Sequence, residues 1–180
     1  NMPAGAERDV LEKIAKLPRL PDSRRQVIEA ASLLRGDAKN IYLAADATEQ
    51  AVRSASLLDF RIVAFATHGL MAEEVPIVSE PALVLTRSKT STSSEDDGLL
   101  TASEIAGLSL QADLVILSAC NTGTNDFRTG VAGLSGLARG FFVAGADSVL
   151  VSHWAVASKP TGLLLNKALE LSSAESSLGN

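Results

Sequence analysis

The sequence predicts an α/β fold with a mostly parallel central sheet and helices on both of its faces. Short, almost wholly apolar runs alternate along the chain with segments that carry apolar residues at helical spacing. Strands without polar alternation are typical of parallel sheets covered on both faces. The most apolar of these runs also end at a histidine, a cysteine or a His-Trp pair. Functional groups of such folds gather at the carboxyl ends of the strands.

The first half of the chain contains the expected helices and strands in alternating order. We expect helices over 23–34 and 49–57 and strands over 41–45 and 61–67. Asp22 or Ser23 can cap the first helix, and Thr48 can cap the second. A strand, a helix and a second strand in so short a stretch predict a βαβ unit, whose strands pair in parallel.

The second half continues the alternation after one polar loop. We expect strands over 80–86, 113–118 and 148–152, and helices over 101–107, 130–146 and 163–171. Thr101 and Glu104 have capping-box spacing, which predicts the start of the short helix. The segment 87–97 is rich in Ser and Thr and contains an acidic run, so we expect a mobile loop there that is open to proteolysis.

Length and composition predict one globular domain. The chain has 180 residues, of which 46% are hydrophobic and 21% are charged. A chain of this size can bury most of its apolar surface around one core. We therefore expect a single domain over residues 1–180, which we interpret as a fragment of a longer protein.

Charge and motif content exclude several classes of function. The net charge is -5 and the basic residues are scattered, with only Arg24 and Arg25 adjacent, so we expect no nucleic-acid partner. No apolar run approaches the roughly 20 residues of a membrane span, and the N-terminus resembles no signal peptide. The single cysteine, Cys120, excludes an internal disulfide and suits the cytoplasm. Neither metal-ligand spacing nor a phosphate-binding glycine motif is present, so we expect no metal and no cofactor.

Cys120 and His68 are the candidate catalytic residues. Each follows an apolar strand and is followed by turn-forming or small residues, which presents the thiol and the imidazole at the sheet edge. A thiol beside an imidazole and free backbone N–H groups forms thiolate, the reactive nucleophile, more readily. The alternative is that Cys120 is a small buried hydrophobe and His68 a hydrogen-bonded core residue.

Neighbouring residues support the catalytic interpretation. Gly69 lets the backbone approach a substrate closely, so its N–H and that of Cys120 are candidates for an oxyanion hole. We expect Trp154 to form a pocket wall and His153 to lie at its rim; the alternative role of His153 is a second base. Ser118 and Ala119 complete the expected substrate-binding set.

Five sequence blocks, in order along the chain, carry a family resemblance. They are ATHG (66–69), EPALVL (80–85), DGLLTASEI (97–105), SACNT (118–122) and VLVSHW (149–154). A caspase-type signature places its histidine about 50 residues before the cysteine, and the separation of His68 and Cys120 fits this. In detail the blocks resemble the CHAT-domain family, bacterial relatives of caspases and separase, over residues 17–156.

The resemblance implies a caspase-like fold and a cysteine endopeptidase that uses a Cys120–His68 dyad on protein or peptide substrates through an acyl-enzyme. It also implies fused or associated tetratricopeptide-type repeats. The alternative is a catalytically silent caspase-like scaffold or signalling module. Because residues 155–159, directly after Trp154, carry no carboxylate, we expect only a weak preference for a basic P1 residue, unless Asp126 or Asp147 folds into the pocket.

Overall fold

A parallel sheet forms the centre of the molecule. The computed structural model describes residues 12–71, 79–88, 96–118 and 127–151. Strands β1 (Ile62–Phe65), β5 (Leu114–Leu117) and β6 (Val149–Val151) pair in parallel, with β5 in the middle. The apolar runs in all three segments therefore form strands as expected, each two or three residues shorter than predicted. The mixed α/β class with a parallel sheet is confirmed.

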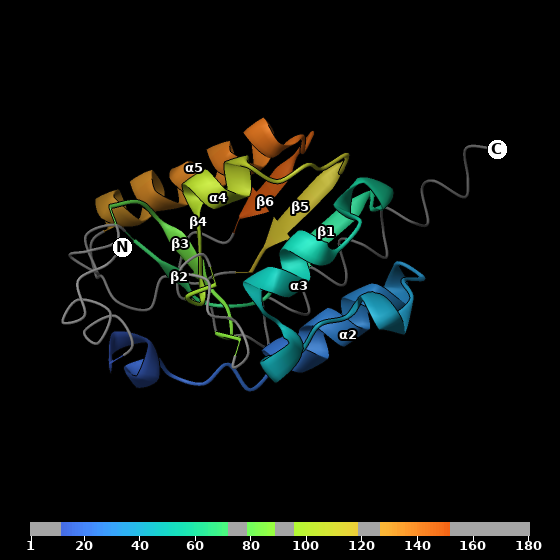
Figure 1. Cartoon of the computed structure of the whole chain (residues 1–180), viewed down its shortest axis with the longest axis horizontal. Helices are drawn as coiled ribbons and strands as arrows, with labels where there is room; N and C mark the ends of the chain where they lie inside the picture. The colour runs from blue at the N-terminus through green and yellow to red at the C-terminus, as the bar shows by residue number, and fades with distance from the viewer. Residues whose placement is uncertain (1–11, 72–78, 89–95, 119–126, 152–180) are drawn as a thin grey trace.

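Helices cover both faces of this sheet (Figure 1). Helices α4 (Ala102–Ala106) and α5 (Phe127–Ala144) lie on one side, and α2 (Ser23–Leu33) lies on the other. Helix α3 (Glu49–Ser54) belongs to the side of α4 and α5, because its Val52 packs against the same core and its Arg53 pairs with Glu104 of α4. Apolar side chains of the strands and of α4 and α5 form the main core, in which Phe141 is fully buried with its ring centroid 5.5 Å from that of Phe65.

Helices α4 and α5 pack with close backbone contact. A Cβ added at Gly140 of α5 would lie 2.8 Å from the carbonyl oxygen of Ala102 and 3.2 Å from Ile105 Cγ2. Only glycine fits at this distance, because a separation below 3 Å forces neighbouring atoms to move. Helix α5 ends at Ala144, and Gly145 follows with φ +109°. It begins three residues before the predicted start and ends two residues before the predicted end.

A second, antiparallel sheet is an addition that the sequence did not predict. It contains β2 (Gly69–Leu70), β3 (Ala82–Val84) and β4 (Leu99–Thr101), with β3 in the middle. The predicted strand 80–86 is thus present as β3, but it pairs outside the parallel sheet. Strand β2 has only two residues, too few to show a periodicity.

The predicted strand 41–45 is wrong, and with it the predicted βαβ unit. Two 3-10 turns, η1 (Ala38–Asn40) and η2 (Ala44–Asp46), flank residues 41–43. These three residues are extended but have no ladder partner in the described residues. Thr86 stabilises the second turn, because its N–H donates to Ala47 O and its hydroxyl to Ala44 O. These hydrogen bonds go to a loop rather than to a neighbouring strand.

Two of the three predicted helix caps are confirmed; the side-chain cap predicted for α2 is wrong, because Asp22 precedes the helix without a capping hydrogen bond and the Ser23 hydroxyl donates to Leu20 O instead. Thr48 caps α3, and Thr101 and Glu104 form the predicted capping box of α4. Helix α3 ends at Ser54, earlier than predicted, because Ala55 is extended (φ -70°, ψ 139°) and a 3-10 turn, η3 (Leu57–Asp59), follows. The predicted helix 163–171 and residues 89–95 of the predicted loop lie outside the described residues.

Candidate functional site

His68 lies just past the carboxyl end of β1, where the parallel sheet meets the antiparallel one. Phe65 of β1 is in register with Leu117 of β5, and Ser118 N donates to Phe65 O at 2.8 Å. His68 comes three residues after Phe65, and Cys120 comes three residues after Leu117. In the sequence, both candidate catalytic residues thus follow paired strands by the same number of residues.

The main chain holds His68 firmly. Its carbonyl oxygen accepts from Val84 N at 2.8 Å, and the hydroxyl of the preceding Thr67 donates to Val84 O. In an antiparallel ladder this pattern places Gly69 at a position that is not hydrogen-bonded to β3. The N–H of Gly69 therefore points away from β3, as a candidate oxyanion donor must.

Within the described residues, one ring nitrogen of His68 has a hydrogen-bond partner and the other has none. Nε2 lies 2.8 Å from the carbonyl oxygen of Pro18, which can only accept a hydrogen bond, so Nε2 carries the proton in the neutral ring. Nδ1 is buried and has no hydrogen-bond partner among the described residues. The side chain is 9% exposed. The ring is thus fixed in the tautomer whose Nδ1 lone pair can accept a proton.

Ser118 places one further polar side chain at this sheet edge. Its hydroxyl donates to Oε1 of Gln26 in α2 at 3.5 Å, the long end of the hydrogen-bond range. Gln26 is buried, and its Nε2 has no partner in the described part of the chain. The sequence analysis missed Gln26. The available signal was its position one turn before Ala30, a polar residue in line with the apolar face of the helix.

Part of the predicted site belongs to segments outside the described residues. Ala119, Cys120, His153 and Trp154 lie outside the described residues. Asp147, which we considered as a pocket acid, lies before β6, with its N–H donating to Ala112 O. It therefore lies beyond the amino-terminal ends of β5 and β6, whereas His68 lies past the carboxyl end of β1, so the suggestion that Asp147 enters the pocket is wrong.

A second polar centre lies around Glu49, the first residue of α3. Its side chain is fully buried. Oε1 accepts from Gly98 N at 2.6 Å, and Oε2 pairs with the Arg53 guanidinium at 3.0 Å. Arg53 also pairs with Glu104 of the capping box at 2.8 Å. This chain of contacts connects α3, β4 and α4.

The environment of Glu49 opposes its ionisation. Burial raises the pKa of its carboxyl from 4.5 to about 7, although the hydrogen bond from Gly98 works in the opposite direction. The nearby carboxylates of Glu104 and Asp97 raise this pKa further, and Arg53 lowers it. Each oxygen of Glu49 has a partner, so we assign this centre a structural role.

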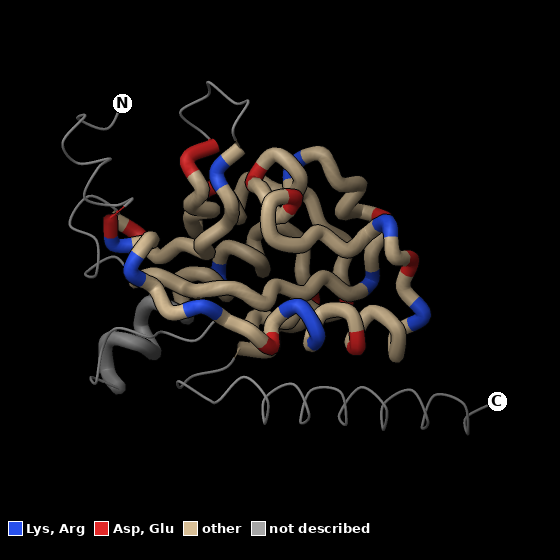
Figure 2. The backbone as a smooth tube through the Cα atoms, turned by 90° about the horizontal axis from the view of Figure 1, so that it is seen from below, with Lys and Arg blue, Asp and Glu red and all other residues tan. Residues whose placement is uncertain are grey.

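The described residues form neither a metal-binding cluster nor a membrane-spanning helix. Across 12–71, 79–88, 96–118 and 127–151, no three His, Cys, Asp or Glu side chains gather in a way that could hold a metal ion. No helix in the same residues has both the length and the apolar character to cross a membrane. Lys and Arg positions alternate with Asp and Glu positions around the tube of Figure 2.

Comparison with family models identifies the family of the chain. A family model, that of the CHAT domain, matches residues 3–175, almost the whole chain. The chain belongs to the CHAT-domain family. This family is related to caspase-like peptidases. Neither the curated proteins nor the solved structures contain a match to this CHAT domain.

Proposed function

We propose that this CHAT domain is a caspase-like cysteine endopeptidase in which His68 is the base and Cys120 the nucleophile. The observation that carries the proposal is the tautomer of His68. Pro18 O occupies Nε2, and the buried Nδ1 keeps a free lone pair within the described residues. A ring that served only to fill the core would use both nitrogens, because an unpaired buried polar atom costs about 1–3 kcal/mol.

The proposed reaction assigns one step to each group. Nδ1 of His68 takes the proton of the Cys120 thiol, and the sulfur attacks the carbonyl carbon of the scissile peptide bond. The N–H groups of Gly69 and Cys120 donate to the oxyanion. His68 then passes its proton to the leaving amine, which departs and leaves a thioester on Cys120. Water, deprotonated by the same ring, hydrolyses the thioester and restores the thiol.

The contact with Pro18 supports both proton transfers. The imidazolium that forms after the first transfer keeps its Nε2–H directed at Pro18 O, so the positive ring remains hydrogen-bonded. The same contact keeps the ring from rotating, which holds Nδ1 in one direction.

The remaining proposals are a cytoplasmic location, a protein or peptide substrate that Ser118, Ala119, His153 and Trp154 contact, and regulation by tetratricopeptide-type repeats.

Alkylation of the single cysteine tests the proposal directly. Iodoacetamide labelling at neutral pH, followed by mass spectrometry, measures the thiolate fraction of Cys120. We expect the His68→Asn variant to label on the order of tenfold more slowly, because the thiol loses its proton acceptor. Equal and slow labelling of both proteins would contradict the dyad and favour a silent scaffold.

A matched control separates this effect from loss of stability. Thr101→Ala removes the cap of α4, far from His68 in the chain, and should lower stability modestly. We expect it to label at the wild-type rate. If Thr101→Ala slowed the labelling as much as His68→Asn, the rate would report folding rather than the proton acceptor.

A further inference from the structure

The antiparallel sheet is apolar on both of its faces. Leu83 of β3 and Leu100 of β4 belong to the main core. The residues that alternate with them form a second apolar cluster, which we call the outer face of this sheet. The outer face consists of Leu70, Ala82, Val84 and Leu99, and the partly buried side chains of Ile14 and Leu17 pack against it.

Ile14 and Leu17 come from one helical turn that precedes α2. Residues 12–16 are helical, and Leu17 N donates to Ile14 O at 3.1 Å. Side chains three positions apart lie on the same side of a helix, so both reach the outer face. The next residue is Pro18, whose carbonyl oxygen lies 2.8 Å from Nε2 of His68. Because the proline ring fixes φ, the position of Leu17 largely determines where this oxygen lies.

The main chain of His68 is attached to the same strands. Its carbonyl oxygen accepts from Val84 N at 2.8 Å, and Val84 belongs to the outer face. Leu70, two residues after His68, belongs to it as well. The imidazole and the oxygen that it contacts are therefore both held by the antiparallel sheet, one through its backbone and the other through the packing of Leu17.

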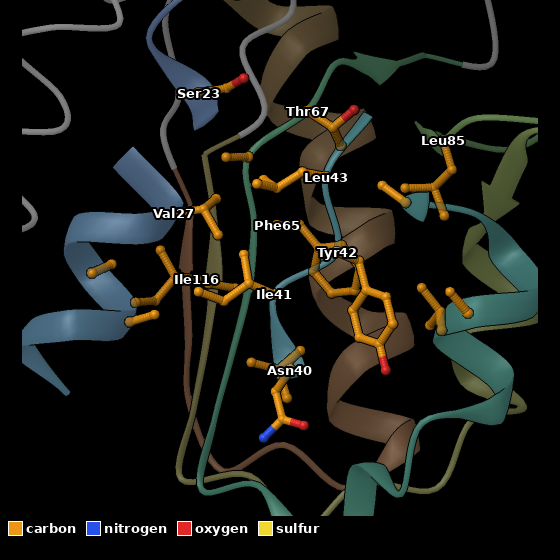
Figure 3. A pocket seen from close by; sticks show the side chains of 18 of the residues that line it. Ser23, Val27, Asn40, Ile41, Tyr42, Leu43, Phe65, Thr67, Leu85 and Ile116 are labelled. Atoms are coloured by element: carbon orange, nitrogen blue, oxygen red, sulfur yellow. The ribbon is translucent and has the colours of Figure 1, made fainter. Parts of the chain in front are cut away.

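On another side, the segment that carries Pro18 borders a cavity of about 1590 Å³, which Pro18, Leu20 and His68 help to line. Figure 3 shows Ser23 and Thr67 at one end of this cavity and Asn40 at the other. Leu20 packs against neither apolar cluster of the described residues. Among these residues, the apolar packing that keeps Pro18 beside His68 therefore comes from Ile14 and Leu17.

We propose that Ile14 and Leu17 are positioning residues for His68. Their packing against the outer face holds Pro18 O at Nε2, and this contact fixes the tautomer and the direction of the ring. Without that packing the chain around Pro18 moves, Nε2 loses its acceptor, and the proton exchanges between the two ring nitrogens. The consequence for reactivity rests on the proposed peptidase function, whereas the positioning of the ring does not.

NMR of the imidazole nitrogens tests the positioning, because the two tautomers of an uncharged ring have different nitrogen shifts. The chain has two histidines, so the spectrum of His68→Asn identifies the signals of His68. We expect the wild-type ring to carry its proton on Nε2 alone and the Leu17→Ala ring to populate both tautomers. Leu17→Met keeps an apolar side chain of similar volume and should retain the wild-type spectrum. An unchanged tautomer in Leu17→Ala would overturn the proposal.

A matched control separates positioning from a general loss of stability. Leu57 is also partly buried, but it packs against the main core. Leu57→Ala removes the same atoms and should leave both the tautomer of His68 and the alkylation rate of Cys120 at wild-type values. Leu17→Ala should lower that rate about fivefold, as expected for the loss of one hydrogen bond. Equal changes in the two variants would overturn the proposal.

Failure of the proposed peptidase function would give a different result. In that case Leu17→Ala would still alter the tautomer of His68, but the wild type and His68→Asn would be alkylated at the same rate. This outcome would support the positioning of the ring by Ile14 and Leu17 and contradict the dyad.

Discussion

His68 and Glu49 are both buried ionisable side chains, but their surroundings differ in one respect. Both oxygens of Glu49 have partners, in Gly98 N and the Arg53 guanidinium. His68 has a partner for Nε2 in Pro18 O and none for Nδ1 among the described residues. The first group is satisfied by the folded chain, and the second keeps one atom available.

The comparison teaches how a structural polar centre differs from one proposed to be catalytic. Glu49 connects α3 to β4 and, through Arg53, to α4, so its contacts stabilise the arrangement of these elements. His68 is held just as firmly through its main chain, but its free nitrogen gives the fold no stability. We therefore expect changes at His68 to alter reactivity and changes around Glu49 to alter stability.

The largest expected effect is on catalysis. Replacing His68 by Asn should lower kcat/KM for a cleaved peptide by about 10²–10⁴-fold, because general acid–base catalysis is lost. Cys120→Ala should abolish the activity, since no other cysteine is present. Thermal unfolding followed by circular dichroism should change little in either variant. Large losses of stability in both variants would mean that these residues, like Glu49, act mainly in stabilising the fold.

The next effect is a pH dependence of stability due to Glu49. Its pKa is raised from 4.5 in the unfolded chain to about 7, so the folded state holds the extra proton between these values. The stability from this group is therefore greatest at the acid end and falls by up to about 3 kcal/mol as the pH rises through that window. Urea unfolding at about pH 5 and about pH 7.5 measures it.

Two variants isolate the contribution of Glu49 to this slope of unfolding free energy against pH. Glu49→Gln keeps an acceptor for Gly98 N but cannot ionise, so the fall in stability should become smaller by the amount due to Glu49. Glu104→Gln removes a carboxylate from the same Arg53 and should keep most of the slope. An unchanged slope in Glu49→Gln would show that this carboxylate is ionised throughout the range.

A smaller effect is expected where α4 and α5 meet. Gly140→Ala places a methyl group 2.8 Å from Ala102 O, and the overlap exceeds the gain in helix propensity. We expect a net loss of about 1–2 kcal/mol in urea unfolding. Gly107→Ala is the control, because its nearest neighbour would be 3.4 Å away. Equal effects at the two glycines would mean that the helices separate without cost.

The smallest effect is expected at the cap of α4. Thr101→Ala removes the hydroxyl that accepts from Glu104 N and should cost about 1 kcal/mol, as other N-cap losses do. Differential scanning calorimetry should detect a lower Tm, with an unchanged rate of Cys120 alkylation. A slower alkylation of Cys120 would mean that the contacts around Glu49 and Glu104 also affect the reactivity attributed to His68.

Local patterns in the sequence were sufficient for part of the fold. The apolar runs that became β1 and β5 are continuous, and the Thr101–Glu104 spacing is a capping signal that needs no tertiary contact. The strand predicted over 41–45 has an equally apolar pattern and is extended at Ile41 and Leu43, yet it lacks a partner in the described residues. Strand formation depends on a neighbour, which a local pattern does not supply.

In the candidate site, too, local sequence patterns predicted the residues that follow a strand but not the contacts between distant segments. His68 was predicted from its place after an apolar strand, and its position past the end of β1 agrees. The contact with Pro18 joins residues 50 positions apart and uses a main-chain atom, so no residue pattern indicates it. Gln26 contacts Ser118 across 92 positions, and its polar character on an apolar helix face was the only sign available.

The acceptor that orients His68 is a backbone oxygen, and every amino acid carries one. An alanine scan would therefore pass over position 18, and aligned relatives could vary there freely while keeping the same hydrogen bond. What must be inherited is the path of the chain, which Pro18 and Pro21 restrict by fixing φ. Insertions or deletions between α2 and the preceding helical turn at 12–16 should be rarer than substitutions there.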